Sequence, residues 1–287
     1  MKILLIDSNN LAHRMAFKLG HLTWQEKTTG VIFGFMKSVM DLSHLLKPNE
    51  IIFCWDSPLS YRRNIFPEYK ASRRKELTEE QQQERKAAYS QFEELKLEIL
   101  PRIGFRNIFE QTGIEADDLI AKIIFDYYLS GYKLIPVSSD NDLFQTFLYM
   151  ERIYLLDKKK FYTKEDFVKE WKISPLEWVT AKSIAGDITD NIPGIKGIGI
   201  KTAIKYINGE KINASLISKV EENWNLVQRN QKIIKIPHTR TLSMSIEESI
   251  INLKEFESVC LENGFSFLLR KENFHKWLNL LEDLPVN

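Results

Sequence analysis

The chain has 287 residues, of which 44% are apolar and 28% charged, as is typical of a soluble globular protein with one large or two modest domains. Its 40 basic and 39 acidic residues nearly cancel, so the net charge of +1 indicates no class of partner. The two cysteines, Cys54 and Cys260, lie far apart, and no apolar stretch is long enough to cross a membrane, which argues against a disulfide framework and a transmembrane protein.

The opening segment, MKILLID, is too short an apolar run for a secretory signal, and we expect a cytoplasmic protein. Its residues 2–6 and two further apolar runs, 50–55 and 133–138, are predicted to be buried parallel strands. Helical periodicity lies between and after these runs, at 34–46, 78–100 and 113–128. Strands that alternate with helices predict an α/β domain built around a parallel sheet.

Acidic residues follow all three predicted strands. Asp7 follows the first strand and Asp56 the second, while Asp140 follows the third, with Asp142 two residues further on. Open parallel sheets place their binding sites at the carboxyl ends of the strands. We therefore expect these four carboxylates to point into one crevice.

The segment 57–100 is too long for a simple crossover between strands, and such insertions are more often functional than decorative. It begins with YRRNIFPEYKASRRK, in which basic residues alternate with aromatic ones. Basic groups and aromatic rings together suit single-stranded nucleic acid, whose backbone is charged and whose bases stack. A solvated basic loop is the alternative, but the position directly after Asp56 favours function.

The helix predicted at 113–128 starts with three acids, Glu115, Asp117 and Asp118. Acids are favoured at a helix start by the free N–H groups and the helix dipole, so capping alone could explain them. Glu115 and Asp118 are spaced i, i+3 and are expected on one face, whereas Asp117 projects from a different azimuth. The acids that follow the strands favour a metal site over simple capping.

Many carboxylates in one crevice would repel one another, so either protons or cations must neutralise them. Ligands that are all oxygens, without His or Cys clusters, favour Mg²⁺ or Mn²⁺ over zinc, and no calcium-binding loop is present. A pair of divalent ions can activate water and stabilise the leaving oxygen in phosphodiester hydrolysis. The candidate ligands are Asp7, Asp56, Glu115, Asp117, Asp118, Asp140, Asp142, Asp187 and Asp190.

The stretch GDITDNIPGIKGIGIKTA is predicted to hold a Gly-rich turn between two short helices. Gly197 and Gly199 let the backbone approach a ligand closely, and the free N–H groups at the following helix start form an anion site. Lys196 and Lys201 add positive charge, which favours a contact to a nucleic-acid phosphate over a plain helix–helix turn. After Pro237 the sequence carries no motif and is expected to pack back as support.

Together these motifs resemble the 5′-nuclease superfamily of 5′→3′ exonucleases and flap endonucleases, most closely its short phage members. The resemblance runs through LLIDSNNLAHR, FCWD, FPEYKASRR, GIEADDLIA, VSSDNDLFQ and GDITDNIPGIKGIGIKTA. It implies a PIN-like α/β nuclease domain at 1–170, with a helical arch at about 57–100. It also implies a helix–three-turn–helix DNA-binding region with C-terminal support at 171–287.

Carried onto this sequence, the resemblance implies that the nine carboxylates are metal-site acids, with Asp190 in an outer position. It implies that Lys70 and Arg73 lie near the scissile phosphate, that Tyr69 stacks on a base and that Arg14 contacts DNA. It further implies two Mg²⁺ ions, for which Mn²⁺ could substitute, and a K⁺ ion at the Gly-rich turn. The DNA-binding residues implied at that turn are Lys196, Gly197, Gly199, Lys201 and Thr202.

The resemblance thus predicts a metal-dependent nuclease that removes nucleotides or flaps from the 5′ ends of branched, nicked or RNA-primed DNA during replication or repair. We expect a monomer without membrane attachment, in a bacterial cell or a phage-infected host. One rival is a PIN-type ribonuclease acting on single-stranded RNA, which would usually lack the arch and the Gly-rich turn. The other is a non-catalytic protein that binds branched DNA, which would tolerate the loss of Asp117, Asp118 or Asp140.

Overall fold

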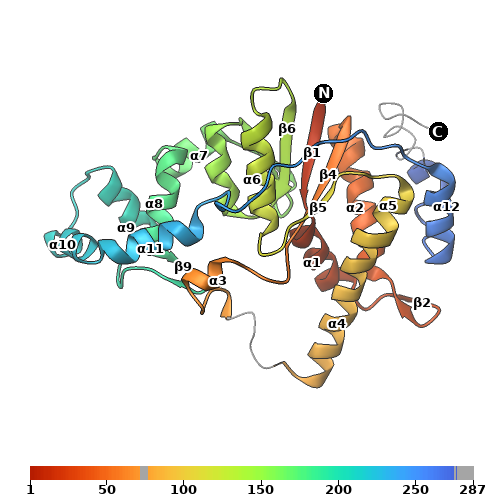
Figure 1. Ribbon diagram of the computed structural model, residues 1–287, viewed down its shortest axis with the longest axis horizontal. Helices are drawn as coiled ribbons and strands as arrows, with labels where there is room; N and C mark the ends of the chain where they lie inside the picture. Colours follow the sequence, from red (N-terminus) through yellow and green to blue (C-terminus); the bar gives the residue numbers. More distant parts are fainter. Residues whose placement is uncertain (72–76, 275, 277–287) are drawn as a thin grey trace.

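A six-stranded sheet forms the centre of the computed structural model, which describes residues 1–71, 77–274 and 276 (Figure 1). The strand order is β5-β4-β1-β6-β7-β8; all neighbours are parallel except β7 and β8, which are antiparallel. The three predicted strands are confirmed and are adjacent in the sheet. The strands are β1 (Lys2–Asp7), β4 (Glu50–Trp55), β5 (Ile108–Glu110), β6 (Lys133–Ser138), β7 (Arg152–Leu155) and β8 (Lys160–Thr163).

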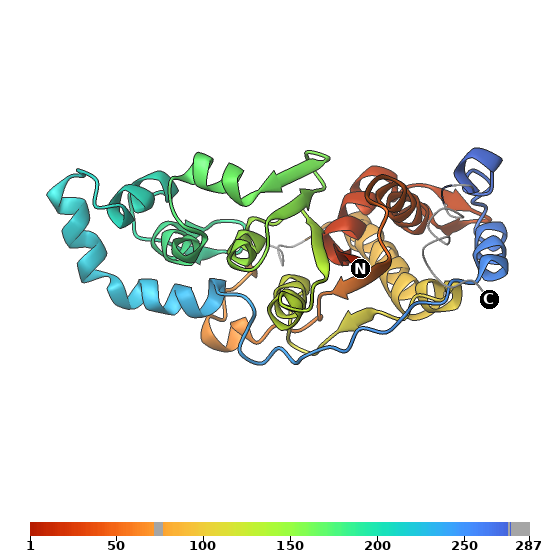
Figure 2. The ribbon, with the colours of Figure 1, turned by 90° about the horizontal axis from the view of Figure 1, so that it is seen from above.

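Helices cover both faces of this sheet, which explains why its central strands are apolar throughout. Alternate residues of β1 face opposite ways: Leu4 and Ile6 pack in a core with α1 (Ser8–Leu19) and α2 (Gly30–Leu46). Ile3 and Leu5 pack in a second core with α6 (Ala116–Tyr127). The view from above shows the helices on either side of the strands (Figure 2).

The long insertion after β4 forms the helices α3 (Arg62–Ile65) and α4 (Glu79–Glu94), and Thr78 caps α4 with a capping box. The π-helical turn η2 (Leu95–Ile99) and α5 (Leu100–Ile103) continue α4 without a break. The prediction of one helical run at 78–100 is therefore confirmed. A small hairpin of β2 (Thr23–Trp24) and β3 (Lys27–Thr28) lies between α1 and α2.

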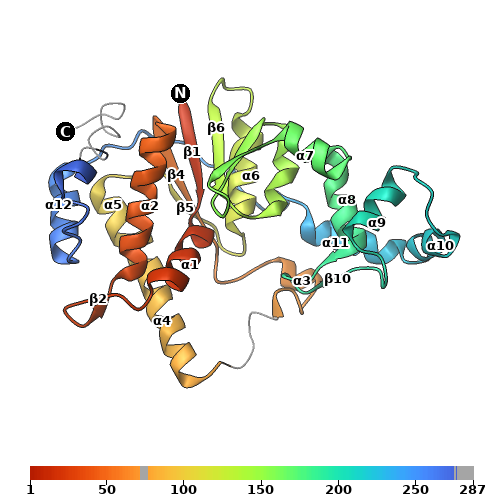
Figure 3. The ribbon, with the colours of Figure 1, turned by 180° about the vertical axis from the view of Figure 1, so that it is seen from behind.

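The part of the chain after β6 is mostly helical (Figure 3). A separate small core, made by Ile184, Ile198, Ala203, Val220 and Val227, holds its last helices together. The predicted boundary at 170/171 falls at the end of α7. The elements are η3 (Asn141–Leu148), α7 (Lys164–Trp171), α8 (Pro175–Ala185), β9 (Gly186–Asp187), β10 (Ile192–Pro193), α9 (Ile200–Ile207), α10 (Ala214–Glu222) and α11 (Trp224–Ile234).

Residues 235–252 return as an extended segment past α6 and β5 and lead to α12 (Leu253–Glu262) at the other end of the molecule (Figures 1 and 2). The side-chain amide of Asn107 donates to the carbonyl of Glu247, and the buried carboxylate of Glu50 accepts from both the N–H and the hydroxyl of Ser249. These hydrogen bonds attach the extended segment to the sheet at β4 and beside β5. Within the described ranges, none of the helices is long and apolar enough to span a membrane.

Candidate metal centre

The carboxyl ends of β4, β1 and β6 lie side by side because β1 pairs in parallel with both neighbours. Asp7 is the last residue of β1, Asp56 and Asp140 follow β4 and β6, and all three line one cavity of about 420 Å³. Glu115 and Asp117, at the start of α6, line the same cavity. The structure therefore brings five of the nine predicted acids together around one hollow.

Asp7 is buried and fixed by its own neighbourhood. One carboxylate oxygen accepts a hydrogen bond from the N–H of Asn10 (3.0 Å), which caps α1, and the other accepts from the hydroxyl of Ser138 (2.6 Å). Burial and the nearby carboxylate of Asp56 raise the pKa of Asp7 to about 7. Asp56 in turn accepts from the N–H of Ala116 (2.7 Å) and so anchors the start of α6 beside the cavity.

The three acids that start α6 have different surroundings. Asp117 faces the cavity, and burial together with the carboxylate of Asp118 raises its pKa well above the ordinary value. Asp118 is fully buried, and its two oxygens lie 2.5 and 2.8 Å from the guanidinium of Arg62. Glu115 and Asp118 do lie on one face, since the same guanidinium nitrogen lies 3.7 Å from Glu115 and 2.5 Å from Asp118, but Asp118 is held in the interior and does not line the cavity.

A second group of acids continues from the cavity toward α8. Carboxylate oxygens of Asp117, Asp140 and Asp142 lie within 4.8 Å of one another. Asp140 caps η3 by accepting from the N–H of Asp142 (2.8 Å), so both acids are fixed at the start of one short helix. Burial raises the pKa of Asp142 to about 6, although Lys182 lies beside it.

Asp187 joins this group through Lys182. The Lys182 ammonium lies 2.5 Å from Asp142 and 2.8 Å from Asp187. The other oxygen of Asp187 accepts from the N–H and the hydroxyl of Thr189. Burial alone would raise the pKa of Asp187, but Lys182 and Thr189 lower it to about 2, so this carboxylate is ionised.

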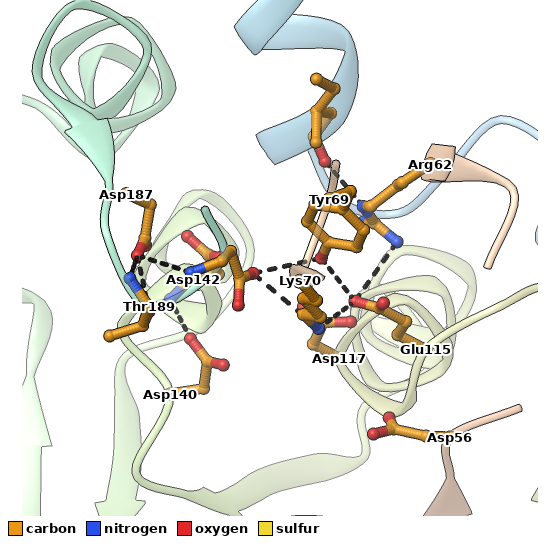
Figure 4. A network of polar contacts seen from close by, with 12 residues as sticks. Asp56, Arg62, Tyr69, Lys70, Glu115, Asp117, Asp140, Asp142, Asp187 and Thr189 are labelled. Atoms are coloured by element: carbon orange, nitrogen blue, oxygen red, sulfur yellow. Dashed lines mark hydrogen bonds and ion pairs between the residues drawn. The ribbon is translucent and has the colours of Figure 1, made fainter. Parts of the chain in front are cut away.

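Lys70 connects the base of the insertion to the other side of the site, on the right in Figure 4. Its ammonium lies 2.7 Å from Glu115 and 3.8 Å from Asp190, and its backbone has a φ of +55°, which is uncommon for a side chain other than glycine. Burial alone would raise the pKa of Glu115, but Lys70 and Arg62 lower it to about 2. Arg73, the other predicted phosphate contact, lies outside the described residues.

Tyr69 does not have the position expected of a base-stacking residue. Its side chain is 2% exposed and packs with Ile192 and Ile233. Its hydroxyl lies 2.9 Å from Glu115 and 3.1 Å from Asp190. The ring is thus covered by protein, and the prediction that it stacks on a base is wrong.

The site has the character of a cation centre. Five carboxylates surround a cavity, and Asp7 and Asp117 have raised pKa values because burial disfavours their charged forms. No His or Cys side chain takes part in the acid cluster of the described residues. Oxygen ligands alone suit a hard divalent cation, so these residues fit an ion of the Mg²⁺ type.

A larger space of about 950 Å³ adjoins this cavity, between α1 on one side and the insertion on the other. His13 and Phe17 line it from α1, Arg85 and Tyr89 from α4, and Lys70 from the base of the insertion. Arg14, predicted to contact DNA, lines the smaller cavity and donates a hydrogen bond to the carbonyl of Leu156 (3.3 Å). Cationic and aromatic side chains therefore border the approach to the acids.

The Gly-rich turn lies between α8 and α9. Ile198 is buried, while Lys196, Gly197 and Gly199 are exposed, so one apolar side chain anchors a turn whose backbone faces outward. Gly197 has a φ of +86°, which favours glycine, and no atom would meet a side chain added there. Lys201 and Thr202 follow in the first turn of α9, which has no side-chain cap, and the N–H of Thr202 donates to the carbonyl of Gly199 (3.0 Å).

Sequence reasoning missed the structural partners of the acids. No sequence pattern predicts that Lys182 and Ser138 contact acids, because these contacts form only when the chain folds. Arg62 was grouped with the basic residues that contact nucleic acid, yet it is buried and donates through Nε to the carbonyl of Ile233 (2.6 Å). No pattern in the sequence separates this buried arginine from Arg63 and Lys70, which are half-buried.

Residues 2–172 match the model of a family described as 5′-3′ exonuclease, N-terminal resolvase-like domain. A 5′-3′ exonuclease of Bacillus subtilis (strain 168) is 29% identical over 274 residues, covering 88% of this chain and 89% of that protein. The fold is similar to that of the phage T5 5′-exonuclease with bound zinc ions, with a TM-score of 0.69 and 20% identity over 83% of this chain and 90% of that one. It is also similar to that of a phage T5 flap endonuclease in complex with DNA and metal ions, with a TM-score of 0.68 and 18% identity over 99% of each chain.

Proposed function

Because this chain belongs to the 5′-3′ exonuclease family, we propose that it is a metal-dependent, structure-specific 5′-nuclease that hydrolyses phosphodiesters in branched, nicked or RNA-primed DNA. One observation carries the proposal: the acids after β1, β4 and β6 and at the start of α6 line a single open cavity. Replication or repair would supply such 5′ ends, and we propose that the protein acts there as a monomer.

The acids that line the cavity, Asp7, Asp56, Glu115, Asp117 and Asp140, would hold the divalent ion, with Mg²⁺ as the proposed metal. When bound there, the metal supplies a Lewis acid that lowers the pKa of an attacking water and neutralises phosphate charge. Asp142 and Asp187 would serve a second ion on the side of α8. Asp118 is assigned a structural role, because both of its oxygens pair with Arg62.

Lys70 would stabilise negative charge on the scissile phosphate. Its ammonium lies at the rim of the cavity, beside Glu115, at the base of the insertion that adjoins the larger space. A cation at that place can turn from Glu115 toward a phosphate that enters the cavity. Preorganised positive charge of this kind favours a transition state in which charge develops on oxygen.

The Gly-rich turn would bind the backbone of duplex DNA. Its exposed backbone and the exposed lysines Lys196 and Lys201 suit a phosphate contact without base reading. Binding should then be independent of sequence and sensitive to salt. We propose that a K⁺ ion at this turn would support the same contact.

Cleavage of 5′-labelled flap, nicked and RNA-primed DNA in Mg²⁺ tests the function. We expect short 5′ products from these substrates, and loss of cleavage both with EDTA and in Asp140→Ala. Single-stranded RNA without a 5′ branch serves as the control, since a PIN-type ribonuclease would cleave it. Cleavage that persists in EDTA and in Asp140→Ala would refute the proposal.

A further inference from the structure

Lys182 is a buried cation inside the acid cluster. It lies on α8, and its ammonium contacts one oxygen of Asp142 (2.5 Å) and one of Asp187 (2.8 Å). Lysine is seldom buried unless it is paired, so these two carboxylates account for its position. The Lys182 ammonium therefore links Asp142, which comes after β6, to Asp187, which comes after α8.

The surroundings of Lys182 leave little negative charge uncompensated on its side of the centre. Asp187 uses one oxygen for Lys182 and the other for the N–H and hydroxyl of Thr189. Asp142 uses one oxygen for Lys182, while its carboxylate also lies near those of Asp117 and Asp140. The ammonium thus occupies the position between Asp142 and Asp187 that a bridging cation would take.

The other side of the centre differs in this respect. Asp7 and Asp117 line an open cavity together with Asp56 and Asp140. At the rim of the cavity the Lys70 ammonium lies beside Glu115 and Asp190. The acids of this half therefore face an open cavity, whereas in the other half a cation of the chain lies between Asp142 and Asp187.

We propose that Lys182 is a built-in counter-cation that competes with a divalent ion for Asp142 and Asp187 and so weakens binding of the second ion. The inference rests on the proposed function only in that the centre binds divalent ions. An ion that takes both carboxylates as ligands must displace the ammonium or lie beside it, and two cations at such a distance repel each other strongly. In the metal-free protein the same ammonium keeps the buried Asp142 and the half-buried Asp187 compatible with folding.

Titration calorimetry of the full-length protein with Mn²⁺, in the absence of DNA, measures this competition. Lys182→Met keeps the length of the side chain and removes its charge, and Lys182→Gln keeps a donor for Asp142 without the charge. We expect two binding events in the wild type, and in both variants the weaker event should strengthen by about tenfold or more. Lys182→Arg should stay close to the wild type. Lys122→Met, which breaks the Lys122–Asp126 pair, is the control for loss of a lysine elsewhere.

Thermal unfolding gives a second readout. Without metal, Lys182→Met and Lys182→Gln should unfold at lower temperature than the wild type, and Mn²⁺ should raise their unfolding temperature by more than it raises that of the wild type. A weaker event that is unchanged or further weakened in Lys182→Gln would overturn the proposal. Absence of Mn²⁺ binding to the wild type would instead refute the metal centre itself, so the two failures are distinguishable.

Discussion

The ion pair of Arg62 and Asp118 offers a direct test of which acids are structural and which bind metal. The two side chains are 2% and 0% exposed, and two guanidinium nitrogens lie 2.5 and 2.8 Å from the two carboxylate oxygens. Asp118→Asn would leave the guanidinium buried without its compensating charge. Loss of one partner of a buried pair costs about 3–5 kcal/mol, and we expect the free energy of unfolding to fall by that amount.

The individual contacts support the same magnitude. Each hydrogen bond to a charged group contributes about 1.5–3 kcal/mol, and the pair has two of them. Asp118 also accepts from the N–H of His238 (2.7 Å) and of Glu115 (3.3 Å), contacts that an asparagine oxygen could keep in part. The loss is therefore expected to come mainly from Arg62.

Urea unfolding without metal, followed by titration with Mn²⁺, separates the two roles. Asp140→Asn is the matched control, because Asp140 is exposed and its carboxylate lies close to those of Asp117 and Asp142. We expect Asp140→Asn to keep or raise stability, since repulsion is relieved, and to weaken Mn²⁺ binding. Asp118→Asn should show the opposite pattern. If Asp118→Asn kept its stability and lost Mn²⁺ affinity as Asp140→Asn does, the structural assignment would be refuted.

Three further predictions concern cleavage, DNA binding and pH. Lys70→Ala should lower the cleavage rate on a flap substrate by roughly 10²–10³ and duplex affinity far less; equal losses would assign Lys70 to binding. Lys201→Ala should weaken duplex binding equally for all sequences and reduce the salt slope by about 1, as fluorescence anisotropy at several salt concentrations would show. A loss that depends on sequence would contradict this role. Without metal, stability in urea should fall as the pH rises from about 4 to about 7, because the folded protein keeps a proton on Asp7 that the unfolded chain releases. Mg²⁺ should reduce this fall, whereas stability that rises with pH in EDTA would contradict the sign.

The sequence predicted the middle of the fold well and its edge strands poorly. The strands at 50–55 and 133–138 were placed with the ends that the structure shows, because each is a continuous apolar run buried on both faces. β5, β7 and β8 have only three or four residues, too few for a periodic pattern to appear. They pair with the sheet because neighbouring strands offer free backbone groups, which is a property of the assembled sheet.

The candidate site shows the same division between local and long-range information. Acids after the strands could be predicted to converge, because parallel strands end at one edge of a sheet. The direction in which the Asp118 side chain points could not be predicted, because it depends on Arg62, a residue 56 positions earlier in the chain. The burial of Tyr69 likewise depends on Ile233, which comes from α11. Residue type and spacing identify an acid or a ring, whereas its partner is set by tertiary structure.

The two lysines of the centre link its charge to the elements that are proposed to bind DNA. Lys70 lies at the base of the insertion, and Lys182 lies on α8, the helix that leads into the Gly-rich turn. A cation that takes Glu115, Asp142 or Asp187 as a ligand would change the contacts of one of these lysines. Because coupling between two binding equilibria is reciprocal, DNA bound at these elements must alter metal affinity by the same factor as metal alters DNA affinity. The acid cluster and the elements proposed to bind DNA would therefore form one linked system, in which metal ions compete with the lysines for the acids and phosphate competes with the acids for the lysines.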